Sequence, residues 1–126
     1  MTAPGEPQLQ SGVLVVQTDP AAGREADFQS WYDGVHIPEI LATPGFVQGA
    51  RFRRVDGAGT GAGAAGDDWR SYLAIYEIRA VNVAAAYGQL LDRMQSGQLS
   101  RSDVFSASAP YRSQLFERVF ALPSAP

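Results

Sequence analysis

Hydrophobic and polar positions along the chain follow two periods, and these predict the order strand, helix, strand, strand, helix, strand. Residues 13–16 form an uninterrupted apolar run before a turn, which predicts a strand buried on both faces. Residues 24–42 carry aromatic and aliphatic side chains at steps of three or four, which is helical spacing. Pro38 disfavours a helical backbone at Ile37, so this helix should kink or restart near His36.

A glycine- and alanine-rich segment, residues 56–68, separates two predicted strands at 46–55 and 72–76. It contains the dinucleotide fingerprint GxGxxG as Gly61-Ala62-Gly63-Ala64-Ala65-Gly66. A phosphate cradle requires a helix that begins at the last glycine, so that backbone N–H groups and the helix dipole face the phosphates. A strand follows instead, and we interpret the segment as a flexible hairpin connection.

The second helix has clear signals at both ends. Asn82 is a good N-cap, and Gly97 supplies a left-handed stop. Between them lies an apolar stripe, made of Val83, Ala86, Tyr87, Leu90, Leu91 and Met94. Residues 98–110 are polar and predict a loop, and residues 111–122 predict the last strand.

These elements predict an α+β fold of ferredoxin-like βαββαβ order, with a four-stranded antiparallel sheet and two helices on one face. Strands 13–16 and 72–76 are apolar at consecutive positions, so both faces of the sheet need cover. No segment remains for a third layer, and a second copy of the chain is the economical cover. We therefore predict a homodimer whose subunit is one domain, residues 12–122, between loose tails at 1–11 and 123–126.

The composition excludes several classes of function. The 126 residues include no cysteine and one histidine, so thiolate chemistry and sites that need two imidazoles from one chain are excluded, and we expect neither a metal nor a cofactor. Net charge is -3 and the ten basic residues are all arginines, dispersed except for Arg51, Arg53 and Arg54, which we interpret as a solvated strand edge. Nucleic-acid binding is not expected. No apolar run approaches a membrane span and no secretory signal is visible, which predicts a cytoplasmic protein without a membrane partner.

The segment Phe28–Leu41 holds the candidate chemistry. Phe28, Tyr32 and His36 are four residues apart, so on a continuous helix they share one face. An imidazole can accept and return a proton near neutral pH, and beside apolar walls it could act on an enolisable or phenolic substrate. The alternative is that His36 fixes the helix end by a hydrogen bond to a nearby carbonyl, with Trp31 in the core.

The phrase WYDGVHIPEILATPGFVQGARF, followed by YLAIYEI and by Ser96-Gly97 through Tyr111, resembles the dimeric α/β-barrel superfamily, particularly EthD-like proteins. The resemblance runs from Val13 to Phe120, and its specific part is Trp-Tyr…His-x-Pro…Pro-Gly-Phe. It implies ferredoxin-like subunits paired sheet to sheet, each with a small-molecule cleft between sheet and helices. The superfamily includes cofactor-free monooxygenases, lactone isomerases, haem-degrading enzymes and decarboxylases or dehydratases of aromatic polyketides. The glycine-rich insert at 57–66 is not a feature of the family core.

By this resemblance His36 is the first candidate for the general acid/base, and Tyr32, which matches the motif tyrosine, is expected to assist it. The other predicted substrate-binding residues are Trp31, Phe28, Arg51, Tyr72, Tyr76 and Tyr111. Our hypothesis is a cofactor-independent lyase or isomerase acting on an apolar, aromatic or polyketide-like small molecule. Three alternatives stay open: a cofactor-free monooxygenase, a haem-handling protein with His36 as axial ligand, and a non-catalytic ligand-binding dimer.

Overall fold

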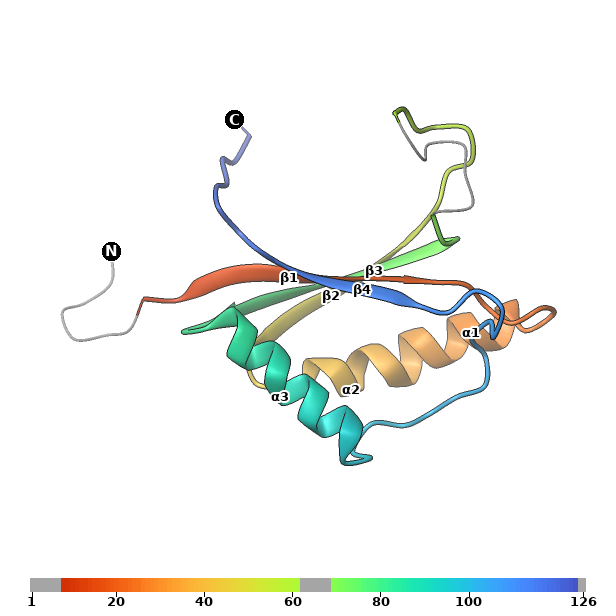
Figure 1. Cartoon of the computed structure of the whole chain (residues 1–126), viewed down its shortest axis with the longest axis horizontal. Helices are drawn as coiled ribbons and strands as arrows, with labels where there is room; N and C mark the ends of the chain where they lie inside the picture. The colour runs from red at the N-terminus through yellow and green to blue at the C-terminus, as the bar shows by residue number, and fades with distance from the viewer. Residues whose placement is uncertain (1–7, 62–68, 125–126) are drawn as a thin grey trace.

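The computed structural model describes residues 8–61 and 69–124, in which four antiparallel strands form one sheet. The central strands are β1 (Gln10–Thr18) and β3 (Tyr72–Ala80). The edges are β2 (Phe46–Arg53) and β4 (Arg112–Glu117), which gives the order β2-β3-β1-β4. The helices lie together on one face of this sheet (Figure 1). The predicted α+β fold, with a four-stranded antiparallel sheet and two helices, is confirmed.

The first helix is continuous but changes its winding in the middle. It consists of α1 (Glu25–Trp31), a π-helical turn at Tyr32–His36, and α2 (Ile37–Leu41). The N–H of Ile37 binds the carbonyl oxygen of Tyr32, which is the wider π spacing, and Pro38 follows at the start of α2. The predicted irregularity near His36 is present as this π turn, but the helix does not restart, because Ile37 keeps a helical backbone with φ of -59° and ψ of -49°. His36 is the last residue of the π turn.

The second helix, α3 (Val83–Gln95), has the predicted ends. The side chain of Asn82 accepts a hydrogen bond of 2.8 Å from the N–H of Ala85, and Gly97 has a φ of +78° beyond the C-terminus. Val83, Ala86 and Leu90 are buried against the sheet. None of the helices within residues 8–61 and 69–124 combines the length and apolar character that a membrane crossing requires.

Element boundaries differ from the predictions at both termini. Gln10 pairs with Ala80, so β1 begins inside the predicted N-terminal tail, which is two residues too long. β4 ends at Glu117 and not at Leu122: its last pair is Glu117 with Gly12, the Arg118 N–H then bonds the Ser11 carbonyl, and β1 extends only to Gln10, too short to pair with the chain as far as Leu122. The remaining tail residues 1–7 and 125–126 lie outside the described residues, as do positions 62–68 of the glycine-rich segment. β2 and β3 are paired neighbours, so that segment does connect a hairpin.

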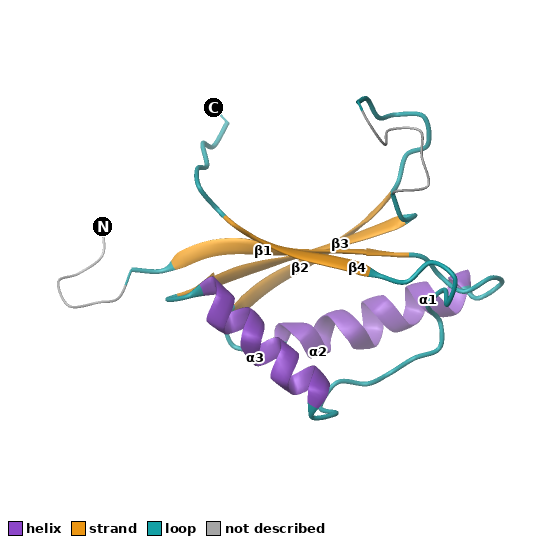
Figure 2. Ribbon diagram, viewed as in Figure 1, coloured by secondary structure: helices purple, strands orange, loops and turns teal. Residues whose placement is uncertain are grey.

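The sheet face opposite the helices is named here the open face. Residues at alternate positions of all four strands share it, and the pairing register brings them into common rows. Its apolar members are Val13, Val15, Ala50, Phe52, Leu73, Ile75 and Phe116. Among the described residues no helix covers this face (Figure 2). β1 was predicted to be buried on both faces. Within one chain it is buried on the helix side, where Leu14 is 3% exposed, whereas Val13 and Val15 on the open face are only partly buried.

Candidate functional site

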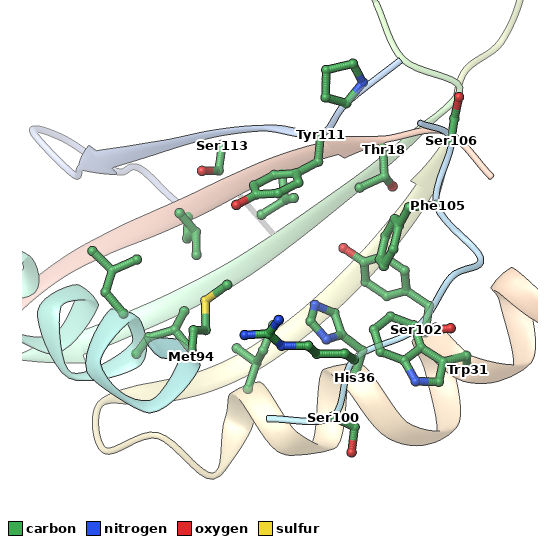
Figure 3. Close-up of a pocket in the computed structure, with 18 of the residues that line it drawn as sticks. Thr18, Trp31, His36, Met94, Ser100, Ser102, Phe105, Ser106, Tyr111 and Ser113 are labelled. Atoms are coloured by element: carbon green, nitrogen blue, oxygen red, sulfur yellow. The ribbon is translucent and has the colours of Figure 1, made fainter. Parts of the chain in front are cut away.

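A cavity of about 450 Å³ lies between the helix side of the sheet, both helices and the segment that follows α3. Figure 3 shows His36, Trp31, Met94 and Phe105 around it. Its aliphatic lining comes from β1, α2 and α3 and consists of Leu14, Val16, Ile40, Leu90, Leu91 and Met94. A cavity of this size with apolar walls and few polar groups is typical of small-molecule sites.

His36 is the titratable group of this cavity whose ordinary pKa lies nearest neutrality. Its ring stacks on Trp31 with 4.7 Å between centroids and 20° between planes, and it meets the rings of Tyr32 and Phe105 edge-on at 5.0 and 6.4 Å. Nδ1 is buried and has no hydrogen-bond partner among the described residues. Burial lowers the pKa of His36 to about 4, against an opposing effect of Glu39. The imidazole is therefore neutral at pH 7.

Tyr32 lines the cavity and also contacts Arg51, which is not part of the lining. The guanidinium carbon of Arg51 lies 4.5 Å from the centre of the Tyr32 ring, and Arg51 donates to Asp33 at 2.8 Å. Burial raises the pKa of the hydroxyls of Tyr32 and Tyr76, so both stay protonated. The two hydroxyls lie close enough to influence each other's pKa, but neither they nor Nη2 of Arg51 make a hydrogen bond of full geometry among the described residues.

The interpretation of Arg51 as part of a solvated edge is wrong. Its side chain is 11% exposed, because strand alternation places it on the helix side, where Asp33 and three aromatic rings enclose the guanidinium. Arg53 and Arg54 are exposed, as predicted. Alternation places Arg53 on the same side, but it is the last residue of β2 and stays exposed, so the sequence alone does not reveal which arginine the structure buries.

Only four of the eight predicted site residues line the cavity. These are His36, Tyr32, Trp31 and Tyr111. Phe28, Arg51, Tyr72 and Tyr76 lie outside its lining. Phe28 and Tyr76 are fully buried core residues, and the Tyr72 hydroxyl bonds Glu25 and accepts from Gln29, which ties α1 to β3.

The segment 98–111 forms one wall of the cavity, and of this wall sequence reasoning anticipated only Tyr111. Leu99 and Val104 are 7% and 2% exposed and anchor it in the core. The Glu39 carboxylate accepts bonds from the Ser100 N–H and hydroxyl at 2.6 and 2.5 Å. The backbone of Phe105 forms an isolated antiparallel β-bridge with Pro20, and Phe105 lines the cavity. The sequence did contain a signal for this docking, because Leu99, Val104 and Phe105 are isolated apolar residues in a polar stretch. Such residues are typical of a loop that packs on a core.

The depressed pKa of His36 predicts a specific dependence of stability on pH. Because the ordinary value is 6.5 and the folded value about 4, the unfolded chain binds more protons than the folded chain in this interval. Stability therefore falls as the pH drops, by about 2 kcal/mol between pH 7 and pH 5 for this group alone. Urea denaturation at both pH values, for the wild type and His36→Gln, isolates this contribution as the difference between the two losses. Equal losses in the two proteins would contradict the burial of an uncharged imidazole.

Comparison with known proteins assigns no family. No protein-family model matches the chain, and no curated protein matches it. A crystal structure of a protein of unknown function from Nitrosomonas europaea matches with a TM-score of 0.47 and 12% sequence identity, covering 96% of this chain and 100% of that chain. This similarity carries no functional information. Within the described residues, no group of three or more His, Asp or Glu side chains could hold a metal ion.

Proposed function

We propose that the chain is a cofactor-independent lyase or isomerase in which His36 moves a proton to and from an apolar, aromatic or polyketide-like small molecule. One observation carries the proposal: an uncharged imidazole, with no partner at Nδ1, lines an otherwise largely apolar cavity. Buried polar groups are normally satisfied by a partner, and an exception calls for a water or a ligand. An imidazole whose task was to fix the helix end would have its bond within the chain.

The protonation state of His36 decides the direction of the first step. A neutral imidazole begins a reaction as a base, so the substrate must offer an acidic C–H or O–H. Its pKa of about 4 makes it a weak base in the empty cavity. The enolate or phenolate that forms would stabilise the imidazolium, because opposite charges attract strongly in a site with little water. The imidazolium then returns the proton to another atom, which completes an isomerisation or expels a leaving group.

Trp31 and Phe105 position the imidazole for this transfer. Trp31 stacks on one face of the ring at 20°, and Phe105 stands nearly perpendicular to it at 73°. Aromatic neighbours restrict the ring to few orientations without offering a competing acceptor. The same rings provide flat apolar surface for an aromatic substrate.

We further propose a ferredoxin-like subunit of the EthD-like type that forms a homodimer through the open face. Two features support the dimer. The open face carries Phe52 and Phe116 at 50% and 53% exposure. Beyond β4 the chain continues with Val119, Phe120 and Leu122 at 98%, 76% and 80% exposure, and large apolar side chains in such number mark an interaction surface.

Deuterium incorporation tests the proton transfer without knowledge of the natural substrate. The probe is 2-tetralone, a bicyclic aromatic ketone with acidic C–H groups, incubated with the protein in D₂O and followed by proton NMR. The wild type is expected to accelerate loss of the α-proton signal above buffer, and His36→Gln is expected not to. Met94→Leu, which changes the same cavity at nearly constant volume, serves as the matched control and should retain exchange. Equal exchange by the wild type and His36→Gln would refute the role of His36.

The same preparations separate the alternatives. A cofactor-free monooxygenase would consume dioxygen in the presence of an electron-rich phenol, which an oxygen electrode detects. A haem-handling protein would give a saturable absorbance change on titration with haem, lost in His36→Gln. A binding module would take up apolar ligands with no exchange, oxygen uptake or haem spectrum.

A further inference from the structure

The cavity carries an unusual balance of charge for this chain. The protein has 13 acidic residues and a net charge of -3, yet among the residues that the structure describes no aspartate or glutamate lines the cavity. The one permanently charged side chain that these residues contribute to the lining is Arg101. A guanidinium stays protonated at any working pH, so the lining is cationic while His36 is neutral.

Acidic residues close to Arg101 in the chain or at its loop are engaged elsewhere. Glu39 accepts both bonds from Ser100, and these bonds lower the pKa of its carboxyl group. Asp103 lies 3.2 Å from Arg24, whose guanidinium lowers the pKa of that carboxyl group. Arg101 itself makes no ion pair or hydrogen bond among residues 8–61 and 69–124. Arg101 is exposed, so water solvates its guanidinium in the empty protein, and no acidic side chain of the described residues competes with a ligand for it.

The backbone that carries Arg101 is held on both sides. Ser100 is fixed by Glu39, and the carbonyl of Val104 accepts a bond of 2.6 Å from the N–H of Ala21. The guanidinium therefore extends from a docked segment and not from a loose loop. A guanidinium can donate two parallel N–H hydrogen bonds to the two oxygens of one carboxylate. Because its backbone is fixed, Arg101 is suited to bind such a group.

We infer that the ligand of this cavity is an apolar carboxylate, whose anionic group is bound by Arg101 at the wall formed by segment 98–111 and whose apolar body fills the space beside His36. The inference rests on the proposed function, since both concern one cavity, but it does not require His36 to act as a base. The Ser102 hydroxyl at the same wall accepts from the Val104 N–H, so its own O–H is suited to accompany the guanidinium as a donor to the carboxylate. The Ser106 hydroxyl can join it when Ser108 donates to Ser106, whereas the Ser100 hydroxyl is already donated to Glu39.

A matched pair of naphthalenes tests the charge requirement. The probes are 2-naphthoate and 2-acetonaphthone, which differ in a carboxylate against an uncharged methyl ketone. Their binding is measured by displacement of the fluorescent reporter N-phenyl-1-naphthylamine. Arg101→Gln is expected to weaken 2-naphthoate about tenfold, because a charge-assisted bond is lost, and to change 2-acetonaphthone less than twofold. Arg101→Lys should restore part of the difference.

Two controls separate the local contact from general effects. Arg79→Gln removes one positive charge from an exposed position outside the cavity, so it should leave both ligands unchanged. Thermal unfolding of each variant establishes that it is folded. Equal weakening of both ligands by Arg101→Gln, no weakening of 2-naphthoate, or no binding of 2-naphthoate to the wild type would each overturn the inference.

The failure of this inference differs from failure of the proposed function. If 2-tetralone exchange depends on His36 while Arg101→Gln does not weaken 2-naphthoate, the role of His36 as a base is supported and the carboxylate site at Arg101 is refuted. If Arg101→Gln weakens 2-naphthoate while His36→Gln leaves exchange unchanged, the carboxylate site is supported and the role of His36 as a base is refuted.

Discussion

Replacing His36 with glutamine is expected to lower turnover of an enolisable substrate by about 10²–10⁴-fold, the range that positioned general acid–base groups contribute. Glutamine keeps a planar polar group of similar reach but cannot accept a proton from carbon at neutral pH. The cavity walls would stay in place, because Trp31 and Phe105 also contact each other at 5.3 Å. The loss should therefore fall on kcat, with a smaller effect on KM.

Folding must be preserved for that result to have meaning. At pH 7 the imidazole is neutral and Nδ1 lacks a partner, so its removal deletes ring contacts but no hydrogen bond at that atom. We expect the thermal midpoint to change by only a few degrees. The measurement is steady-state turnover and thermal unfolding on the same samples, with Met94→Leu as the matched cavity variant. A folded His36→Gln protein with wild-type kcat would remove His36 from the mechanism.

The fold was predictable because its strongest signals are local. Asn82 and Gly97 bracket α3 through backbone chemistry that depends on a few neighbouring atoms. Pro38 marked the irregular turn at Tyr32–His36 by the same kind of local restriction, although the helix continues through it. The end of β4 was not predictable, because it depends on where the antiparallel partner strand β1 begins.

Of the candidate site, the part contributed by the first helix was predictable from the sequence, and most of the wall at segment 98–111 was not. Trp31, Tyr32 and His36 sit within six consecutive positions, and helical spacing was enough to bring them together. The wall at segment 98–111 depends on tertiary anchors such as the pair Glu39–Ser100, which are 61 residues apart. The prediction that Arg51 is solvated failed for a related reason, because its burial depends on strand pairing and on the helix above it and not on its neighbours in the sequence.

Replacing Phe52 and Phe116 together with glutamate is expected to convert a dimer into a monomer. The two residues lie on opposite edge strands of the open face and are about half exposed within one chain, at 50% and 53%. A two-fold interface contains each of them twice, so four side chains change at once. Covering the exposed half of a phenylalanine contributes roughly 1 kcal/mol, so the four together amount to about 4 kcal/mol, or about 10³-fold in the dissociation constant. Four carboxylates facing one another would add repulsion.

Light scattering after size exclusion at low micromolar concentration measures the outcome directly. The wild type should give twice the chain mass of 13.5 kDa, and the double variant the chain mass itself. Gln89→Glu, combined with Gln98→Glu, adds the same number of carboxylates at exposed positions outside the open face and should leave the dimer intact. Because Phe52 and Phe116 lie outside the buried core, the monomeric variant should remain folded by circular dichroism. A wild-type protein that is monomeric under these conditions would leave the exposed apolar side chains of the open face and of Val119, Phe120 and Leu122 to some other partner, and the sheet-to-sheet dimer would be wrong.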